Sequence, residues 1–205
     1  MKVTKAQAEA NRAHIVETAT TLFRERGYDG VGVADLMGAA GFTHGGFYRH
    51  FGSKADLMAE AAACGIAQTT ALSEGVSAAD FVKAYISRQH RDALAGGCTM
   101  AALGGDAARQ GAEVRAPFAA GIEGILAALS RDADFAGQDD PAQVRVRALD
   151  LLARAVGAIV LSRACPDDSP LADEILAACR SQALPAPKAA PKARAAGRRA
   201  APKRP

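Results

Sequence analysis

Residues 33–54, VADLMGAAGFTHGGFYRHFGSK, constrain the fold of this chain more than any other stretch. Apolar residues recur at helical spacing from Val33 to Ala40, which predicts a short helix with one buried face. Gly41 follows, and a glycine in the left-handed backbone conformation is a common helix end. Thr43 then offers a hydroxyl that can cap the free amides of a second helix, HGGFYRHF. The pattern therefore predicts two helices joined by a tight turn.

The second predicted helix has two unlike faces. Phe47 and Phe51 lie four residues apart and are expected to face inward, whereas the outward residues are polar, aromatic or small: His44, Gly45, Tyr48 and Arg49. Each glycine inside a helix costs about 1 kcal/mol relative to alanine, so a Gly pair points to a requirement such as close approach to DNA. This layout is typical of a DNA-reading helix-turn-helix. A plain helical hairpin with no nucleic-acid role is the alternative.

A third helix start follows directly. Ser53 and Asp56 have the spacing of a capping box, and Lys54 stands in the first turn. Free amides and a lysine at a helix start suit a DNA phosphate.

Together with the preceding FRERGYDGVGVADL, this stretch closely resembles the N-terminal domain of the tetracycline-repressor (TetR) family of bacterial regulators, over residues 10–58. Gly32 and Val33 stand where members often carry a phosphate-binding Ser or Thr, and Gly46 replaces a usual Thr, Ser or Ala. The family pattern is met by Gly41, Phe42, Thr43, Tyr48, Phe51, Gly52, Ser53 and Lys54.

The resemblance implies an all-α fold with two functional parts. A three-helix helix-turn-helix DNA-binding domain would occupy residues 1–52, and a helical ligand-binding and dimerisation domain residues 53–184. Residues 185–205, rich in Pro, Ala, Lys and Arg, are expected to be a basic disordered tail because they lack apolar bulk. Such a tail would serve solvation or loose attachment to DNA phosphates.

Charge alone does not indicate a DNA-binding face. The net charge is +3, but residues 184–205 hold seven Lys or Arg and no acid, which leaves 18 basic against 22 acidic side chains elsewhere. Residues 1–60 contain seven of each. Whether a DNA-binding face exists therefore depends on where the basic residues lie in the fold. The candidates for phosphate contacts are Arg49, Lys54 and the N-terminal Lys2, Lys5 and Arg12.

Other features bound the class of protein. No apolar run is long enough to span a membrane and the N-terminus lacks the apolar segment of a signal peptide, so we expect a cytoplasmic protein without membrane contact. The four cysteines are far apart and lack metal-binding spacing, so reduced thiols, no metal and no cofactor are expected.

Further along the chain, start and stop signals predict a series of helices. Residues 1–9 are expected to form a flexible arm and residues 135–138 a loop, and one helix is expected to bury Phe81, Ala84, Tyr85 and Leu94. The predicted helices cover residues 10–26, 53–74, 77–92, 112–131, 140–164 and 169 onward.

Cys98 is predicted near the first turn of a helix, in a GCxxAAL segment resembling one in a subset of TetR-like regulators. The helix dipole there would favour a reactive thiolate. The alternative is that Cys98 packs in the core as a small apolar residue.

The last two helices carry more apolar surface than one packed layer needs, since Val146, Leu149, Val156, Val160 and Leu161 add a second face. In TetR-like proteins these helices pair with their copies in a second subunit, whereas the alternative is burial within the same chain. The homodimer interface predicted from the resemblance comprises Leu149, Leu152, Val156, Val160, Leu171, Ile175 and Cys179.

The leading hypothesis is a ligand-responsive transcriptional regulator: a homodimeric repressor that a small, mainly apolar effector releases from a palindromic double-stranded DNA operator. The residues expected at DNA are Thr43, His44, Gly45, Gly46, Tyr48, Arg49 and Lys54. The residues expected at the effector are Phe81, Tyr85, Cys98, Met100, Leu103, Phe118 and Ile122.

Three other functions remain open. Cys98 could sense an electrophile or oxidant within the same regulator. A cysteine enzyme with His90 as base lacks a recognisable third group and oxyanion hole, so we expect no catalytic residues. A nucleoid-type protein would bind DNA through its tail alone.

Overall fold

The computed structural model describes residues 4–73, 75–137 and 139–183, and within these ranges all regular structure is helical, as the sequence predicts. The tail of residues 185–205 lies outside the described residues, and the domain division at residue 52 stays a prediction. In chain order the elements are α1 (Lys5–Arg26), α2 (Val33–Ala39), η1 (His44–Arg49), α3 (Lys54–Ser73), α4 (Ala78–Tyr85), α5 (Arg88–Asp92), α6 (Thr99–Ala107), α7 (Ala112–Arg131), α8 (Ala133–Ala136), α9 (Pro141–Arg163) and α10 (Pro170–Ala183).

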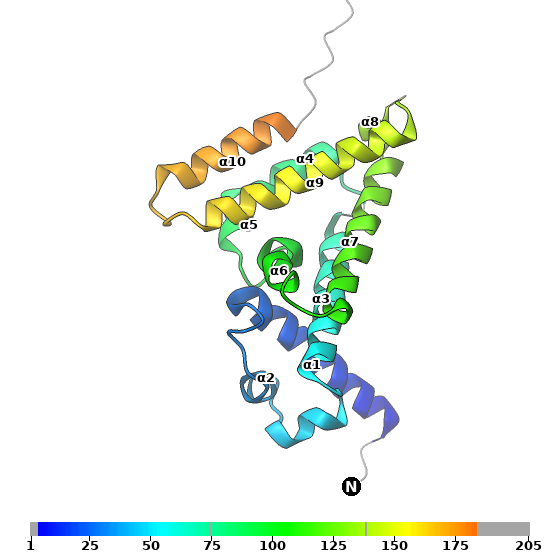
Figure 1. Ribbon diagram of the computed structural model, residues 1–205, viewed down its shortest axis with the longest axis vertical. Helices are drawn as coiled ribbons and strands as arrows, with labels where there is room; N and C mark the ends of the chain where they lie inside the picture. The colour runs from blue at the N-terminus through cyan, green and yellow to red at the C-terminus, as the bar shows by residue number, and fades with distance from the viewer. Residues whose placement is uncertain (1–3, 74, 138, 184–205) are drawn as a thin grey trace, which may run out of the picture.

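Helix α3 connects the two ends of the molecule (Figure 1). Its first half packs against α1, beside α2 and η1, and its length runs alongside α7. Helices α9 and α10 lie side by side at the other end of the molecule and cross above α6. A movement of one end of α3 therefore reaches the other end through a single rigid element.

The turn after α2 forms as predicted. Gly41 has a φ of 78°, and its N–H donates to the carbonyl of Gly38 over 3.1 Å. The N–H of Phe42 donates to the carbonyl of Met37 over 2.8 Å, which completes a Schellman motif. Phe42 then packs half-buried against the core.

Helix α1 starts earlier than predicted. The Thr4 hydroxyl accepts a hydrogen bond from the N–H of Gln7 over 3.2 Å, so the helix begins at Lys5 and the flexible arm expected over residues 1–9 is wrong where the structure describes it. One face of α1 packs into the core, because Ile15, Ala19 and Phe23 are fully buried.

The helix predicted over residues 77–92 is broken into α4 and α5. Ser87 interrupts it because its hydroxyl caps a new helix, accepting from the N–H of His90 over 3.2 Å. The break buries Val82 and Ile86, while Ala84 and Leu94, which we expected to be buried, are exposed.

The loop predicted at residues 135–138 is also partly wrong. Residues up to 136 belong to the short helix α8, which Asp132 caps by accepting from the N–H of Phe135 over 3.2 Å.

Three helices meet at Gly65, a buried residue of α3. A Cβ at this position would lie 2.2 Å from Oγ1 of Thr99 on α6 and 2.9 Å from Cγ2 of Thr20 on α1. Both threonines are 1% exposed, and the Thr20 hydroxyl donates to the carbonyl of Ala61 on α3 over 3.1 Å. The closeness of α1, α3 and α6 therefore requires a residue without a side chain at Gly65.

We predict that Gly65→Ala lowers the free energy of unfolding by about 1–3 kcal/mol, because the added methyl overpacks this crossing. Gly105→Ala is the matched control, since a Cβ at that α6 position meets nothing within 4 Å and should stabilise the helix by up to about 1 kcal/mol. Urea unfolding followed by circular dichroism measures both. Effects of the same sign in the two variants would contradict the close approach.

Candidate DNA-reading surface and regulatory core

The second helix of the helix-turn-helix is a six-residue 3₁₀ helix, η1, rather than the α-helix expected. The N–H of Gly46 donates to the carbonyl of Thr43 over 2.9 Å, and the N–H of His50 to that of Phe47 over 2.9 Å. A segment this short with two glycines gains little from α-helical hydrogen bonds, which accounts for the tighter form. Thr43 occupies the N-cap position, but its hydroxyl makes no capping bond, so that expectation is wrong.

The two faces of η1 are as predicted. Phe47 and Phe51 are 0% and 2% exposed, with ring centroids 5.5 Å apart. On the opposite side the side chains of His44, Tyr48 and Arg49 are exposed, and Tyr48 is 70% exposed. Burial of the two phenylalanines therefore holds the polar and aromatic face toward solvent.

In the described part of the chain, the backbone conformation of η1 does not require its glycine pair. Neither Gly45 nor Gly46 has a positive φ. A Cβ at Gly45 would meet nothing within 4 Å, and one at Gly46 would make ordinary contacts of 3.6 Å with Cε of Met37 and 3.8 Å with Oγ1 of Thr43. Gly45 therefore leaves open space on the exposed face, whereas Gly46 faces Met37 of α2.

Lys54 braces the domain. Its ammonium donates to the carbonyl of Tyr28 over 2.6 Å and lies 5.9 Å from the centroid of the Phe23 ring. This bond ties the start of α3 to the turn after α1, while the ammonium retains further N–H donors. Ser53 caps α3 as predicted, because its hydroxyl accepts from the N–H of Asp56 over 3.0 Å.

Sequence reasoning missed the brace that Arg12 provides. Its guanidinium pairs with Glu60 of α3, donates to the carbonyl of His50 over 3.2 Å, and lies 4.6 Å from the centroid of the Phe51 ring. The Glu60 carboxylate raises the pKa of Arg12. These partners are far away in sequence, so no local pattern could have revealed the contact.

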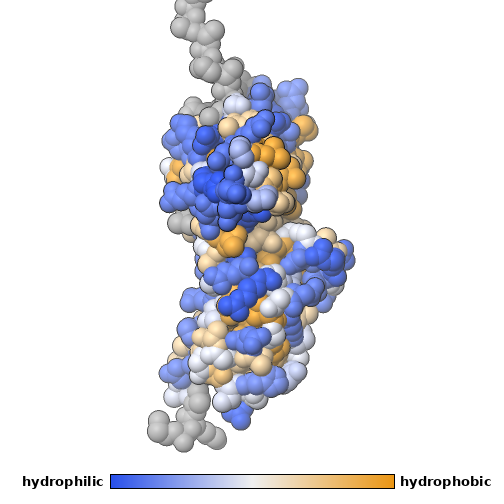
Figure 2. Space-filling model, turned by 90° about the vertical axis from the view of Figure 1, so that its left-hand side faces the viewer, coloured by the Kyte–Doolittle hydropathy of each residue, from blue (hydrophilic) through white to orange (hydrophobic). Residues whose placement is uncertain are grey.

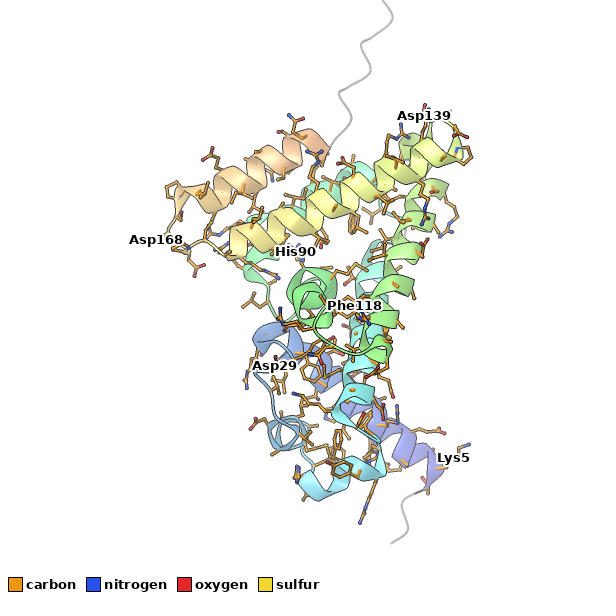
Figure 3. All side chains as sticks on the ribbon, in the orientation of Figure 1. Lys5, Asp29, His90, Phe118, Asp139 and Asp168 are labelled. Carbon is orange, nitrogen blue, oxygen red and sulfur yellow. The ribbon has the colours of Figure 1, made fainter. Side chains whose placement is uncertain are left out.

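The expected effector residues lie mostly in closed packing. Five of them are at most 8% exposed, and Phe81 and Ile122 are partly buried against the same core. Phe118 on α7 belongs to this group and is labelled in Figure 3. The five buried residues are Tyr85, Cys98, Met100, Leu103 and Phe118.

His90 holds the start of α6 in place (Figure 3). Its Nε2 accepts a hydrogen bond from the backbone N–H of Cys98 over 3.0 Å, so the ring proton is assigned to Nδ1, which donates to the carbonyl of Tyr85 over 2.7 Å. Burial lowers the pKa of His90, which favours this neutral form. Because Nε2 already accepts a hydrogen bond from a backbone amide, His90 holds the backbone in place and does not serve as a base for the Cys98 thiol.

Cys98 occupies the N-cap position of α6 and is 5% exposed. The side chain of Tyr85, a residue 7% exposed, lies beside that of Cys98, and burial is the main cause that raises the pKa of Tyr85. The guanidinium of Arg24 donates to the carbonyl of Gly97, next to Cys98, over 3.2 Å. The thiol is thus surrounded by polar groups within an otherwise apolar core.

An open cleft of about 560 Å³ lies elsewhere, between the end of α3, the start of α4 and the second half of α7. Of the expected effector residues only Phe81 lines it. The lining residues are Thr69, Thr70, Gly75, Val76, Ser77, Ala78, Phe81, Gly124, Ile125, Ala128, Leu129, Arg131 and Asp132.

An apolar face on the last two helices is exposed, with side chains of Val146, Leu149, Val160, Leu161 and Leu171 between 43% and 66% exposed. Figure 2 shows apolar surface at the side of the part of the molecule that holds α9 and α10. Four other predicted interface residues are partly buried against the subunit's own core: Leu152, Val156, Ile175 and Cys179. Across the described residues, no helix is both long and apolar enough to cross a membrane.

Residues 15–70 match the sequence model of the family described as "Bacterial regulatory proteins, tetR family". The HTH-type transcriptional regulator AcrR of Shigella flexneri is 39% identical over 57 residues, covering 28% of this chain and 26% of the relative. The HTH-type transcriptional repressor DhaR of Mycobacterium sp. (strain GP1) is 51% identical over 43 residues, covering 21% and 22%. The matched segment thus spans about a quarter of the length of these relatives.

Solved structures share the fold over most of the chain. Escherichia coli NemR in its reduced form superposes with a TM-score of 0.67 at 21% identity, covering 85% of this chain and 95% of the other. A TetR-family regulator from Cytophaga hutchinsonii gives a TM-score of 0.68 at 19% identity, covering 89% and 96%. AibR, in complex with isovaleryl coenzyme A and operator DNA, gives 0.57 at 19% identity, covering 84% and 97%. Residues 15–70 thus match the helix-turn-helix domain of the TetR family, and the all-helical fold of the chain is shared with a solved TetR-family regulator.

Proposed function

We propose that this protein is a homodimeric repressor that binds a palindromic DNA operator through η1 and leaves it when a small, mainly apolar effector binds. The observation that carries the proposal is the exposed face of η1, where a Cβ at Gly45 would meet nothing within 4 Å and no positive φ requires a glycine. AibR was solved with operator DNA and an acyl coenzyme A, so a related fold accommodates both kinds of partner.

At the operator, η1 enters the major groove with its exposed side. Arg49 reads a base edge, most favourably guanine, and the bare backbone at Gly45 and Gly46 permits close approach to the groove. His44 lies at the groove wall. Thr43 and the remaining Lys54 donors contact phosphates, with Tyr48 beside them.

The exposed apolar side chains of α9 and α10 support a two-fold dimer through these helices. A dimer would present two copies of η1 to successive major grooves, about 34 Å apart. The partly buried Leu152, Val156, Ile175 and Cys179 would border this interface. An effector that favours a different separation of the two copies of η1 lowers operator affinity by linkage.

We predict that Gly45→Leu lowers operator affinity at least about tenfold without lowering the free energy of unfolding, because the side chain fills space reserved for DNA. Binding is measured by footprinting and mobility shift on DNA upstream of the protein's own gene. Gly105→Leu on α6, equally open but distant from η1, should bind like the wild type. Equal affinity of the two variants, or no protected site for the wild type, would refute the reading surface.

Val160→Glu should shift the protein from dimer to monomer in analytical ultracentrifugation, because it places a charge within the proposed apolar interface. Val76→Glu is the control, since Val76 is 43% exposed and Val160 44%, but Val76 lies away from α9. A wild-type monomer, or an unaltered dimer in the Val160 variant, would exclude this interface.

A second candidate mechanism is covalent switching at Cys98, favoured by its place at the start of α6 beside the Tyr85 side chain. With hydrogen peroxide, the sulfur would bond to one oxygen while the O–O bond breaks, giving a sulfenic acid and water. We predict that Cys98→Ser abolishes peroxide-dependent release from the operator and leaves DNA affinity unchanged. Cys165→Ser is the control variant. Peroxide-dependent release from the operator that persists in Cys98→Ser would exclude this mechanism.

A further inference from the structure

We propose that the cleft between α3, α4 and α7 is the effector site, and that its ligand is an amphipathic carboxylate whose apolar body lies in the cleft while its carboxylate pairs with Arg131. The regulatory consequence of this inference rests on the proposed function, whereas the binding itself does not.

The walls of the cleft fit an apolar body. Its volume of about 560 Å³ falls in the range of small-molecule sites. Apolar side chains come from both sides, with Val76 and Phe81 on one and Ile125 and Leu129 on the other. The hydroxyl of Thr69 donates to the carbonyl of Gly65 over 3.1 Å, which leaves its lone pairs available to accept.

The charges at the cleft favour an anion. Asp132 is engaged as a helix cap, because its carboxylate accepts from the N–H of Ala78 over 2.9 Å and from the N–H of Phe135 over 3.2 Å. Arg131, in contrast, is exposed and makes no hydrogen bond or ion pair within the described part of the chain. A guanidinium without a partner at the edge of an apolar cleft offers a bidentate site for a carboxylate.

The buried core around Tyr85, Cys98 and Phe118 is a poorer site. Its side chains are packed so closely that a Cβ added at Gly121 on α7 would lie 2.6 Å from Cγ2 of Ile66 and 3.0 Å from Cε of Met100. Entry of a ligand there would require repacking, whereas the cleft is already open.

The cleft connects to the DNA-reading end through α3. Thr69 and Thr70 line the cleft on the last turns of this helix, while Glu60 and Lys54 tie its first turns to α1 and to the turn after it. A ligand that separates α3 from α7 at the cleft therefore displaces the support of η1.

Octanoate, 1-octanol and octylamine, which share one apolar chain, are the probes for calorimetry on the full-length protein. We expect octanoate to bind most tightly, and Arg131→Gln to weaken octanoate about tenfold while leaving 1-octanol unchanged. Arg115→Gln, an exposed arginine on the same helix far from the cleft, is the matched control. Ala128→Trp should block all three probes by filling the cleft, and Ala127→Trp, which does not line it, should not.

The proposal would be overturned if octylamine bound more tightly than octanoate, or if the two arginine variants lost equal octanoate affinity. Binding that survives Ala128→Trp, or the absence of binding heat with every probe, would also overturn it. Thermal unfolding confirms that each variant folds, and Arg131→Gln changes only an exposed side chain. An operator footprint without octanoate binding would refute the site alone. Octanoate binding without any operator footprint would refute the proposed function and leave the site intact.

Discussion

The close crossing of α1, α3 and α6 at Gly65 is the constraint on which the arrangement of the molecule depends. With no side chain at Gly65, Thr20 and Thr99 approach the α3 backbone from two sides. Dense packing of this kind transmits the displacement of one helix to its neighbours, because it leaves no empty space into which side chains can move. Helix α3 is therefore held between the helix-turn-helix and the C-terminal helices as one continuous support.

Hydrogen bonds reinforce this junction at both ends of α6. At its start, Arg24 of α1 donates to the carbonyl of Gly97, and His90 holds the N–H of Cys98. Near its end, the Asp106 carboxylate accepts from the N–H of Tyr28 over 3.1 Å, at the turn after α1. The helix-turn-helix and the C-terminal helices thus share contacts besides α3, so a displacement at Cys98 or in the cleft has a physical route to η1.

Local chemistry accounts for the parts of the fold that sequence reasoning obtained correctly. Gly41 ends α2, Ser53 starts α3, and the bounds of α7, α9 and α10 follow apolar stripes with proline or glycine signals at their ends. The errors have local causes of similar size. The Thr4 cap extends α1, the Ser87 cap divides α4 from α5, and the glycine pair makes η1 a 3₁₀ helix, because each choice lies within about 1 kcal/mol of its alternative.

The sequence by itself determined the helix-turn-helix and its exposed residues, because periodicity, turn glycine and caps act within a few residues of one another. Only the tertiary structure decided that Arg12 braces the end of η1 from α1, and that Lys54 ties the start of α3 to the turn after α1. It also decided that the cleft lies beside Arg131 rather than among Tyr85, Cys98 and Phe118. Those features come from side chains tens of residues apart, and their separation depends on how helices pack, which no local pattern encodes.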